Sequence, residues 1–349
     1  MIHLVGLPHT VFDAEISSSC AFTAKAVRLA DMIKATGREV TVYWGSAEER
    51  AKYFPNYDPA ELPAIGWNDK LPYWVEFNQR CIRQIKETIQ PNDIIALVGG
   101  PISQVVADVF PNHTICEPGV GYEGLGTNTF ACFESYAWMH NRYGAYGIGD
   151  GRFFDTVIPN AVDPAKWSMA DSDGYALFVG RLISRKGPDI AGEIARAVGM
   201  PLVLAGGGVD HVGPGLVVAT DGTQIRGDVT HVGAVSGEDR RWLFAHAEVF
   251  ICPTRYIGPW EGVHAEAMMS GVPVVAPDYG VFTETLPAGY RYRTLNQAVA
   301  AVHAGAQTRG EAWRERAIRK CSTKVCTAMY DSWFDRLESL RDGRNGWYG

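Results

Sequence analysis

The sequence contains no uninterrupted apolar run near the ~18 residues that a membrane-spanning helix requires. Its first residues also lack the basic region that opens a signal peptide, so we expect a cytoplasmic protein. Positive charge is in deficit, because 32 lysines and arginines stand against 39 acidic residues and give a net charge of −7. This balance argues against a large basic surface for nucleic acid and leaves room only for local basic patches.

Several motif classes are also missing. There is no G-x-x-x-x-G-K-[ST] motif, which disfavours a P-loop NTPase. No G-x-G-x-x-G with a later ribose-binding acid follows the first expected strand, which disfavours a dehydrogenase. The seven cysteines form no C-x-x-C pair, so we interpret them as reduced core residues and expect no disulfide framework and no bound metal. No Ser/His/Asp or Cys/His set indicates a protein nucleophile.

The size of the chain predicts two domains. Single hydrophobic cores stop growing at roughly 250 to 300 residues, and this sequence has 349 residues, 46% of them apolar. A short apolar segment at 155–159 runs into Asn160 and is followed by Pro164 and a polar stretch. We therefore place the domain boundary here, with a first domain at 1–163 and a second at 164–324.

The first domain has the pattern of an α/β fold. Strands are expected at 2–6, 39–44, 93–98 and 114–117, with helices at 20–35, 77–89 and 105–109, while 46–75 is expected to be a long excursion. In doubly wound sheets, ligands bind beyond the carboxyl ends of the strands. Gly6 and His9 are therefore candidates to line a crevice. His9 also fits a loop histidine whose hydrogen bonds are satisfied by its neighbours.

Two other places in this half are candidate binding residues. Glu117 follows an expected strand and stands beside Pro118, where it suits either a sugar contact or a capping acid. The segment 127–143 is dense in aromatic residues with polar tips, which suits stacking on sugars or bases but also suits a buried helix. Its acceptor candidates, together with one preceding tyrosine, are Tyr122, Glu134, Trp138 and His140.

The second half repeats the α/β pattern. Strands are expected at 175–179, 201–205, 229–233 and 249–252, with helices at 188–198 and 238–247. A basic loop at 180–187 follows the first of these strands, and Gly206 follows the second. A further helix should begin near Gly262 and end at Gly271. A helix N-terminus with the acid Glu266 on its flank suits a ligand that carries both phosphate and hydroxyl groups.

These motifs resemble the retaining glycosyltransferases of family 4. Glu266-Ala-Met, Gly271 and Pro273-Val-Val match the second half of the family signature, and the segment 158–163 resembles the family's Ile-Pro-Asn-Gly-Val-Asp. The resemblance implies a GT-B fold, in which two Rossmann-like, doubly wound domains face a cleft. It also implies that a C-terminal helix, about 325–349, crosses back to the first domain. That fold serves transfer of a sugar from a nucleoside diphosphate sugar to an acceptor, without a metal or other cofactor.

The resemblance also assigns roles to residues. Arg181 and Lys186 would bind the diphosphate, which lies among the backbone of Gly180, Gly206, Gly262 and Val263. Glu266 would hold the ribose. The first acid of the signature is missing, because Gly258 stands in its place, and Glu261 stands where the family usually has glycine. Glu261 or Glu117 would then position the transferred sugar.

The last part of the sequence has helical periodicity. From residue 314 onward, apolar side chains recur at i, i+3 and i+4 spacing, which predicts one long amphipathic helix. We expect it to brace the first domain. Attachment to a membrane surface is the alternative, which the acids Asp331, Asp335 and Glu338 weaken.

Three other functions share parts of this pattern. The acceptor can be DNA or a modified base, which the acidic composition disfavours. The protein can instead be a nucleotide-sugar 2-epimerase, since these enzymes have the same architecture. It can also be a sugar-nucleotide binding protein without turnover, because Gly258 replaces an acid.

Overall fold

The computed structural model describes residues 1–10, 21–53 and 66–340. Within the chain, two compact units are present. The first comprises Met1–Glu134, Met139–Ala161 and Cys326–Gly349, and the second comprises Ser135–Trp138 and Val162–Val325. Position 20, where we expected a helix to start, and residues 54–65 of the expected excursion at 46–75 lie outside the described residues.

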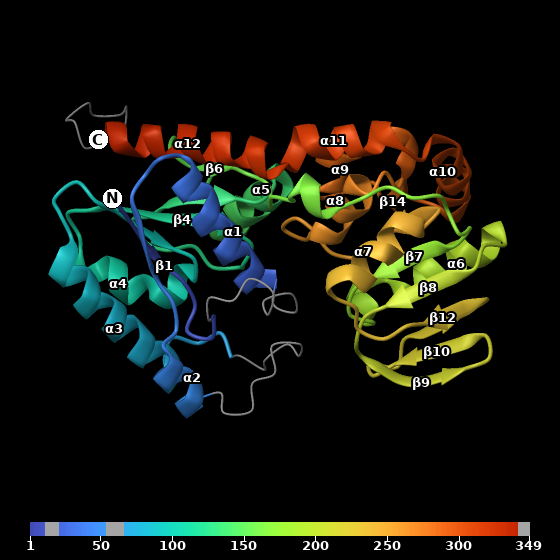
Figure 1. Ribbon diagram of the computed structural model, residues 1–349, viewed down its shortest axis with the longest axis horizontal. Coiled ribbons are helices and arrows are strands. Elements are labelled where there is room, and N and C mark those ends of the chain that lie inside the picture. Colours follow the sequence, from blue (N-terminus) through green and yellow to red (C-terminus); the bar gives the residue numbers. More distant parts are fainter. Residues whose placement is uncertain (11–20, 54–65, 341–349) are drawn as a thin grey trace. The chain divides into compact units, whose positions relative to one another are not determined.

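The first unit is built on a six-stranded parallel sheet with the order β2-β1-β3-β4-β5-β6 (Figure 1). The strands are β1 (Ile2–Val5), β2 (Val40–Tyr43), β3 (Ile94–Leu97), β4 (Thr114–Val120), β5 (Phe130–Phe133) and β6 (Thr156–Val157). Every residue of β1 and β3 is buried, as expected for apolar strands whose sheet is covered on both faces. The helices are α1 (Ala21–Ala35), α2 (Ala47–Tyr53), α3 (Pro72–Thr88), α4 (Gln104–Val109) and, from Met139 onward, α5 (Tyr136–Tyr146).

Three expectations for this half need correction. The helix expected at 77 begins at Pro72, where the fixed backbone of proline suits a first helical turn. Strand β4 does not end at Glu117 but runs on to Val120 with an irregular register against β5. The aromatic segment 127–143 is not one helix, because it divides into β5 and the start of α5.

The second unit contains another six-stranded parallel sheet, with the order β12-β8-β7-β13-β14-β15. Its strands are β7 (Ala176–Val179), β8 (Leu202–Ala205), β12 (Val229–His231), β13 (Val249–Ile251), β14 (Val274–Pro277) and β15 (Arg291–Tyr292). The main helices are α6 (Pro188–Val198), α7 (Gly237–His246), α8 (Gly262–Met269), α9 (Phe282–Thr285), α10 (Leu295–Thr308) and α11 (Glu311–Cys321). Both units are therefore doubly wound α/β sheets.

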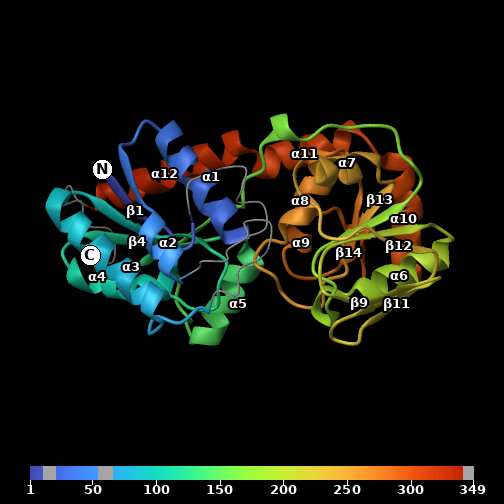
Figure 2. The same cartoon turned by 60° about the horizontal axis from the view of Figure 1, so that its bottom comes forward.

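A second, smaller sheet lies beside the main sheet of this unit, and our sequence reading missed it. Strands β9 (Val209–Gly213), β10 (Leu216–Ala219) and β11 (Gln224–Arg226) form an antiparallel sheet with the order β11-β10-β9. Figure 1 shows β9 and β10 beyond β12, and Figure 2 shows β11 close to α6. The side chains of Val217 and Ile225 are fully buried, so the insertion shares the core of the unit.

The C-terminal helix expected from residue 314 is in fact two helices, α11 and α12 (Thr323–Ser339). The chain at Val162 separates them, because its amide donates to Cys321 O and its carbonyl accepts from the amide of Thr323. Ser322 forms an isolated parallel bridge with Val162. The backbone groups at the break are thus satisfied by another segment instead of by helix continuation.

Helix α12 belongs to the first unit from Cys326 onward and lies beside α1 (Figure 1). Trp333 is fully buried and its indole donates to Phe154 O over 2.8 Å. The guanidinium of Arg38 reaches three acids of α12, namely Asp331, Asp335 and Glu338. An apolar anchor and a charged cluster therefore fix this helix to the unit.

Two further features are the character of the helices and the state of the cysteines. Within the described residues, none of the helices combines the length and the apolar character that a bilayer span demands. The six described cysteines (Cys81, Cys116, Cys132, Cys252, Cys321 and Cys326) are all buried and free.

Candidate functional site

The carboxyl ends of β7 and β8 in the second unit bring two predicted residues together. Gly180 follows β7 and Gly206 follows β8, and a Cβ added to Gly206 would lie 1.9 Å from Gly180 O. Only glycine permits this approach of the two loops. Arg181 follows Gly180 and is exposed, and no ion pair joins it to any residue that the structure describes. It is therefore available to a ligand.

Lys186 is held by a short 3-10 turn at Ser184–Lys186. The amide of Ser184 donates to Asp221 Oδ2 over 2.7 Å, and Ser184 O accepts from Arg255 over 2.6 Å. Lys186 Nζ donates to Glu261 Oε2 over 2.5 Å and to the hydroxyl of Tyr256 over 2.9 Å. Burial disfavours the ammonium, but the neighbouring Glu261 and Tyr256 leave the pKa of Lys186 raised, so the side chain is cationic.

Glu261 has a backbone conformation that explains why glycine is usual at this position in the resembled family. Its φ of 58° lies in the left-handed region, and it forms the N-cap of α8. Its side chain is only 4% exposed. A Cβ added to Gly258 would lie 2.2 Å from Glu261 Oε1, so the carboxylate occupies the space of a side chain at position 258. The sequence alone did not decide whether Glu261 or Glu117 takes the place of the missing acid.

Helix α8 begins directly after this acid. Gly262 is exposed and Val263 is partly buried, and amides in the first helical turn have no intrahelical acceptor. Met268 and Met269 are fully buried, as expected for the face that packs on the sheet. The helix start thus offers N–H groups and the positive end of the helix dipole next to Lys186 and Glu261.

Glu266 pairs with an arginine that sequence reasoning missed. Arg240 on α7 donates to Glu266 Oε2 from Nε over 3.0 Å and from Nη2 over 2.5 Å. Both bonds reach the same oxygen, and the side chain of Glu266 is 21% exposed. The other oxygen, Oε1, is therefore left to accept from a hydroxyl group.

A buried histidine supports the start of α8. His264 Nδ1 donates to Glu261 O over 2.6 Å, because a carbonyl can only accept. Its ring is fully buried, and burial lowers the pKa of His264 to about 4. The imidazole is therefore neutral and serves to fix the backbone of Glu261.

In the first unit, Gly6 and His9 follow β1, but their surroundings explain them without a ligand. A Cβ on Gly6 would lie 2.5 Å from the ring of Trp44, so packing of this ring requires glycine. His9 is 1% exposed and its Nε2 lies 3.2 Å from the hydroxyl of Thr23. Burial lowers the pKa of His9 to about 4. These positions favour the interpretation of His9 as a loop histidine satisfied by its neighbours.

Glu117 is fully buried and holds the loop that follows it. It accepts hydrogen bonds from the hydroxyl of Tyr122 over 2.8 Å, from the amide of Gly126 over 2.7 Å and from the hydroxyl of Thr129. Burial raises its pKa, although these donors act against the shift. With its oxygens occupied by the protein, Glu117 is better suited to structure than to a sugar contact.

The remaining acceptor candidates have different surroundings. Glu134 pairs with Lys25 over 2.8 Å, and Lys25 also donates to Gly119 O over 2.6 Å, with both side chains nearly buried. Trp138 is buried, whereas His140 is exposed. Glu134 thus belongs to an ion pair and Trp138 to the packed interior, while His140 alone of these three is open to solvent.

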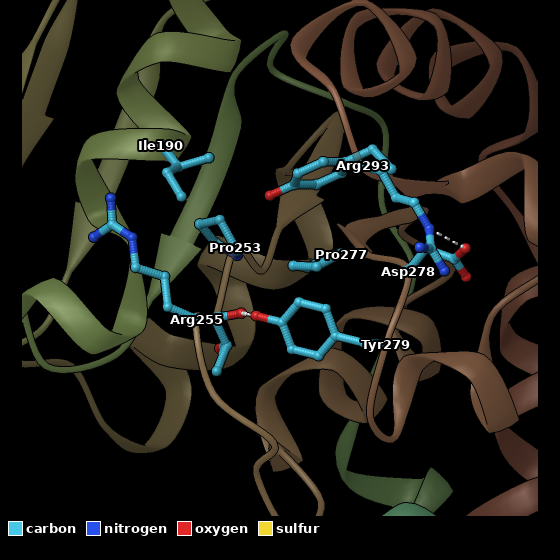
Figure 3. A pocket seen from close by; sticks show the side chains of 9 residues that line it. Ile190, Pro253, Arg255, Pro277, Asp278, Tyr279 and Arg293 are labelled. Carbon is cyan, nitrogen blue, oxygen red and sulfur yellow. Dashed lines mark hydrogen bonds and ion pairs between the residues drawn. The ribbon is translucent and has the colours of Figure 1, made fainter.

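A separate pocket of about 460 Å³ lies at the carboxyl ends of β13, β14 and β15 (Figure 3). It is lined by Ile190, Pro253, Thr254, Arg255, Pro277, Asp278, Tyr279, Tyr292 and Arg293. Figure 3 shows Arg255 and Arg293 on opposite sides of it. Arg255 pairs with Asp189 and Arg293 pairs with Asp278, so both cations already have acidic partners. None of the predicted binding residues lines this pocket.

Metal ligands are not clustered in this structure. Across residues 1–10, 21–53 and 66–340, no group of three or more His, Cys, Asp and Glu side chains is arranged to hold a metal ion. The acids of the candidate site are paired instead with arginine and lysine.

Comparison with known families finds a match within the second unit. Residues 173–306 match the family model "Glycosyl transferases group 1". This segment of the chain is similar to a group 1 glycosyltransferase domain. The matched residues include Lys186, Arg240, Glu261 and Glu266, so the polar cluster described above lies inside the matched segment.

One curated protein similar to this segment is the GDP-mannose-dependent alpha-mannosyltransferase of Mycolicibacterium smegmatis. It is 32% identical over 134 residues, which make up 38% of this chain and 33% of the relative. The match thus spans about a third of the relative's length.

Solved structures extend the likeness to the whole chain. AviGT4, a glycosyltransferase involved in avilamycin A biosynthesis, has a TM-score of 0.65 at 19% identity and covers 97% of this chain and 98% of its own. Sucrose-phosphate synthase from Thermosynechococcus elongatus has a TM-score of 0.67 at 15% identity, with 97% and 99% covered. HepE of Anabaena, solved with UDP and glucose, has a TM-score of 0.60 at 16% identity, with 96% and 99% covered. The expected GT-B fold, with two Rossmann-like domains, is confirmed.

Proposed function

We propose that this protein is a retaining glycosyltransferase that moves a sugar from a nucleoside diphosphate sugar to an acceptor hydroxyl. The observation that carries this proposal is the cluster at the start of α8, where Lys186, Glu261 and free helix amides meet. A cation and N–H donors match the diphosphate, which is the leaving group of such a donor, and the acid beside them matches the sugar.

Arg181, Lys186 and the amides of Gly262 and Val263 would bind the diphosphate. As the glycosidic bond breaks, negative charge grows on the oxygens of the departing phosphate. Fixed cations and N–H groups stabilise that charge more in the transition state than in the bound donor, so they raise the rate and not only the affinity.

Glu266 would hold the ribose. Arg240 occupies Oε2 with two hydrogen bonds, which leaves Oε1 as an acceptor for a ribose hydroxyl. Because Arg240 fixes the carboxylate, the ribose would meet an acid whose orientation is set before binding.

Glu261 is the better of the two predicted acids for positioning the transferred sugar. Its carboxylate lies beside the phosphate-binding Lys186, whereas the oxygens of Glu117 are occupied by three donors of the protein. The acceptor hydroxyl would attack from the face of the leaving phosphate. No protein nucleophile and no cofactor would then be needed.

GDP-mannose is the first donor to test, because the mycobacterial relative is described as GDP-mannose-dependent. Thermal-shift measurements should compare GDP-mannose with UDP-, ADP- and dTDP-sugars, since a true ligand raises the melting temperature by mass action. The stabilising donor is then incubated with an acceptor panel and followed by NMR of the anomeric proton. We expect a glycosylated product with the donor's anomeric configuration.

The role of the cations has its own test. Replacing Lys186 with Met should lower kcat by about 100-fold to 1,000-fold, as loss of a single charge-stabilising group does elsewhere. Replacing Arg185 with Met is the matched control, because Arg185 stacks on Tyr256 at 3.8 Å and pairs with no acid in the described chain. Unchanged turnover in the Lys186 variant, or sugar epimerisation without an acceptor, would refute the proposed reaction.

A further inference from the structure

We propose that Glu261 selects nucleoside diphosphate sugars over free nucleoside diphosphates, by repelling the extra charge of an unsubstituted terminal phosphate. This inference rests on the proposed function, and it assigns Glu261 a role in donor specificity and in product release as well as in sugar positioning. Its basis is the position of one carboxylate directly against the phosphate-binding lysine.

The charge of Glu261 lies in a confined place. Its side chain is 4% exposed, that of Lys186 is 20% exposed, and the two meet at 2.5 Å. Water screens a charge poorly in such surroundings, so the carboxylate acts strongly on any anion that approaches the same ammonium. Glu261 thus competes with the phosphate of a ligand for the ammonium of Lys186.

The position of this carboxylate is fixed by the backbone. Glu261 O accepts from both the amide of His264, over 3.1 Å, and His264 Nδ1, over 2.6 Å. The space next to Gly258 is filled by Glu261 Oε1, because glycine provides no side chain there. An approaching phosphate therefore meets a carboxylate that is held near Lys186 by neighbours on two sides.

The two ligands differ in charge at this point. A terminal phosphate without a substituent loses a second proton with a pKa of about 6, whereas a phosphate that carries a sugar has no such proton to lose. At pH 7.5 the free nucleoside diphosphate therefore places about one more negative charge near Glu261. The sugar of the intact donor instead offers hydroxyl groups, which donate to the carboxylate.

Glu261 therefore favours the donor and disfavours the product. When the acceptor oxygen bonds to the anomeric carbon and the glycosidic bond breaks, the shared electron pair stays on the phosphate oxygen. The proton of the acceptor hydroxyl passes to this phosphate and, at pH 7.5, on to solvent, so the terminal phosphate gains the charge that Glu261 repels. The same repulsion disfavours a nucleoside triphosphate, whose chain carries still more charge. Release of the nucleoside diphosphate is thus promoted by the acid that held the sugar.

Calorimetric titration tests this proposal. GDP and GDP-mannose, or the corresponding pair for whichever donor stabilises the protein, are titrated into the wild type and into Glu261→Gln at pH 7.5. Glutamine keeps the shape of the side chain and removes its charge. We expect the affinity for the free diphosphate to rise about tenfold and that for the sugar nucleotide to change less than about threefold.

Two further variants sharpen the result. Glu193→Gln removes an exposed acid on α6 and should leave the ratio of the two affinities as in the wild type. The exchange Gly258→Glu with Glu261→Gly returns an acid to the same space from the other position and should restore the wild-type ratio. Lowering the pH to 5.5 protonates the free diphosphate and should reduce the effect of Glu261→Gln.

The possible failures can be told apart. If no nucleotide binds the wild type, the proposed function itself is wrong. If nucleotides bind but Glu261→Gln changes both affinities by the same factor, or lowers that of the free diphosphate, only the selection by charge is overturned.

Discussion

Arg240 and Glu266 form a fixed pair in which two donors of one guanidinium, Nε and Nη2, converge on the single oxygen Oε2. The pair joins α7 to α8, which are consecutive helices of the second unit. Because Oε2 is occupied, Oε1 alone is presented to a ligand. The orientation of the proposed ribose acid thus depends on a residue outside the signature that predicted it.

Replacing Arg240 with Ala should weaken donor binding. Without its partner, the carboxylate of Glu266 rotates freely, and ordering it on the ribose costs about 1 kcal/mol or more. We expect KM for the donor to rise about tenfold while kcat changes less. Arg240→Lys should restore part of the donor affinity. Arg241→Ala removes the next arginine on the same helix and should leave KM for the donor unchanged. Equal losses in the two alanine variants would argue for a general effect on α7.

Gly187 and Gly199 flank α6 with the same backbone conformation, at φ 71° and 67°. A Cβ on Gly187 would lie 2.3 Å from Pro253 O, whereas one on Gly199 would meet nothing within 4 Å. Gly199→Ala should therefore cost only the left-handed strain of about 1–2 kcal/mol. Gly187→Ala should lower the free energy of unfolding by more than this. It should also reduce turnover, because the substitution directly follows Lys186. Urea unfolding curves and initial rates of both variants provide the comparison, and equal effects would contradict it.

Stability should fall on acidification through the buried histidines. The pKa of His264 is lowered to about 4 in the folded state from an ordinary value of 6.5, so the unfolded chain binds the proton more readily. Stability is thus fully present above pH 6.5 and is lost progressively as the pH falls toward 4. For His264 alone, the loss between pH 7.5 and 4.5 is about 2–3 kcal/mol.

Chemical unfolding at several pH values measures this dependence. In His264→Phe the decline toward low pH should be shallower. The remaining share includes His9, whose pKa is lowered to about 4, and His3, whose pKa burial also lowers. His246→Gln is the control, since that histidine lies on the surface of α7. A wild-type decline that His264→Phe leaves unchanged would contradict the assignment.

Arg38 should contribute to the docking of α12. Its guanidinium is 13% exposed and reaches Asp331, Asp335 and Glu338. Because the three acids are partly solvated, Arg38→Met should destabilise the protein by only about 1–2 kcal/mol, and less at high salt. Arg336→Ala, which removes a single bond to Thr156 at 3.3 Å, should have a smaller effect. Melting curves at low and high salt would show the difference.

The sequence predicted the two parallel sheets because their strands are short, nearly continuous apolar runs, such as Val249–Ile251. It did not predict the antiparallel sheet β9–β11. In this sheet, β10 and β11 alternate between buried and more exposed residues, and β9 has no buried residue. The signals were present, however. Pro214-Gly215 connects β9 to β10, and Asp221-Gly222 lies between β10 and β11, which are dipeptides typical of tight turns.

The residues of the candidate site also fall into two groups, those that the sequence indicated and those that it did not. Lys186 and Glu266 stand in local motifs, so their sequence context was enough to single them out. Arg240 and Tyr256 were missed because their partners lie 26 and 70 positions away, and only the tertiary fold brings them together. The place of the Glu261 carboxylate depends on a left-handed backbone angle that a non-glycine residue seldom adopts, which no sequence pattern indicates.

The assignment of Cys326–Gly349 to the first unit has a consequence for how the protein is made. A ribosome must synthesise all of Val162–Val325 before Trp333, which is buried against Phe154, can take its place. The second unit can therefore fold on the nascent chain while the earlier sheet still awaits its last covering helix. The N-terminal unit leaves the ribosome first, but it exposes apolar surface until its last helix is made. Chaperones that bind such surface would therefore bind this unit.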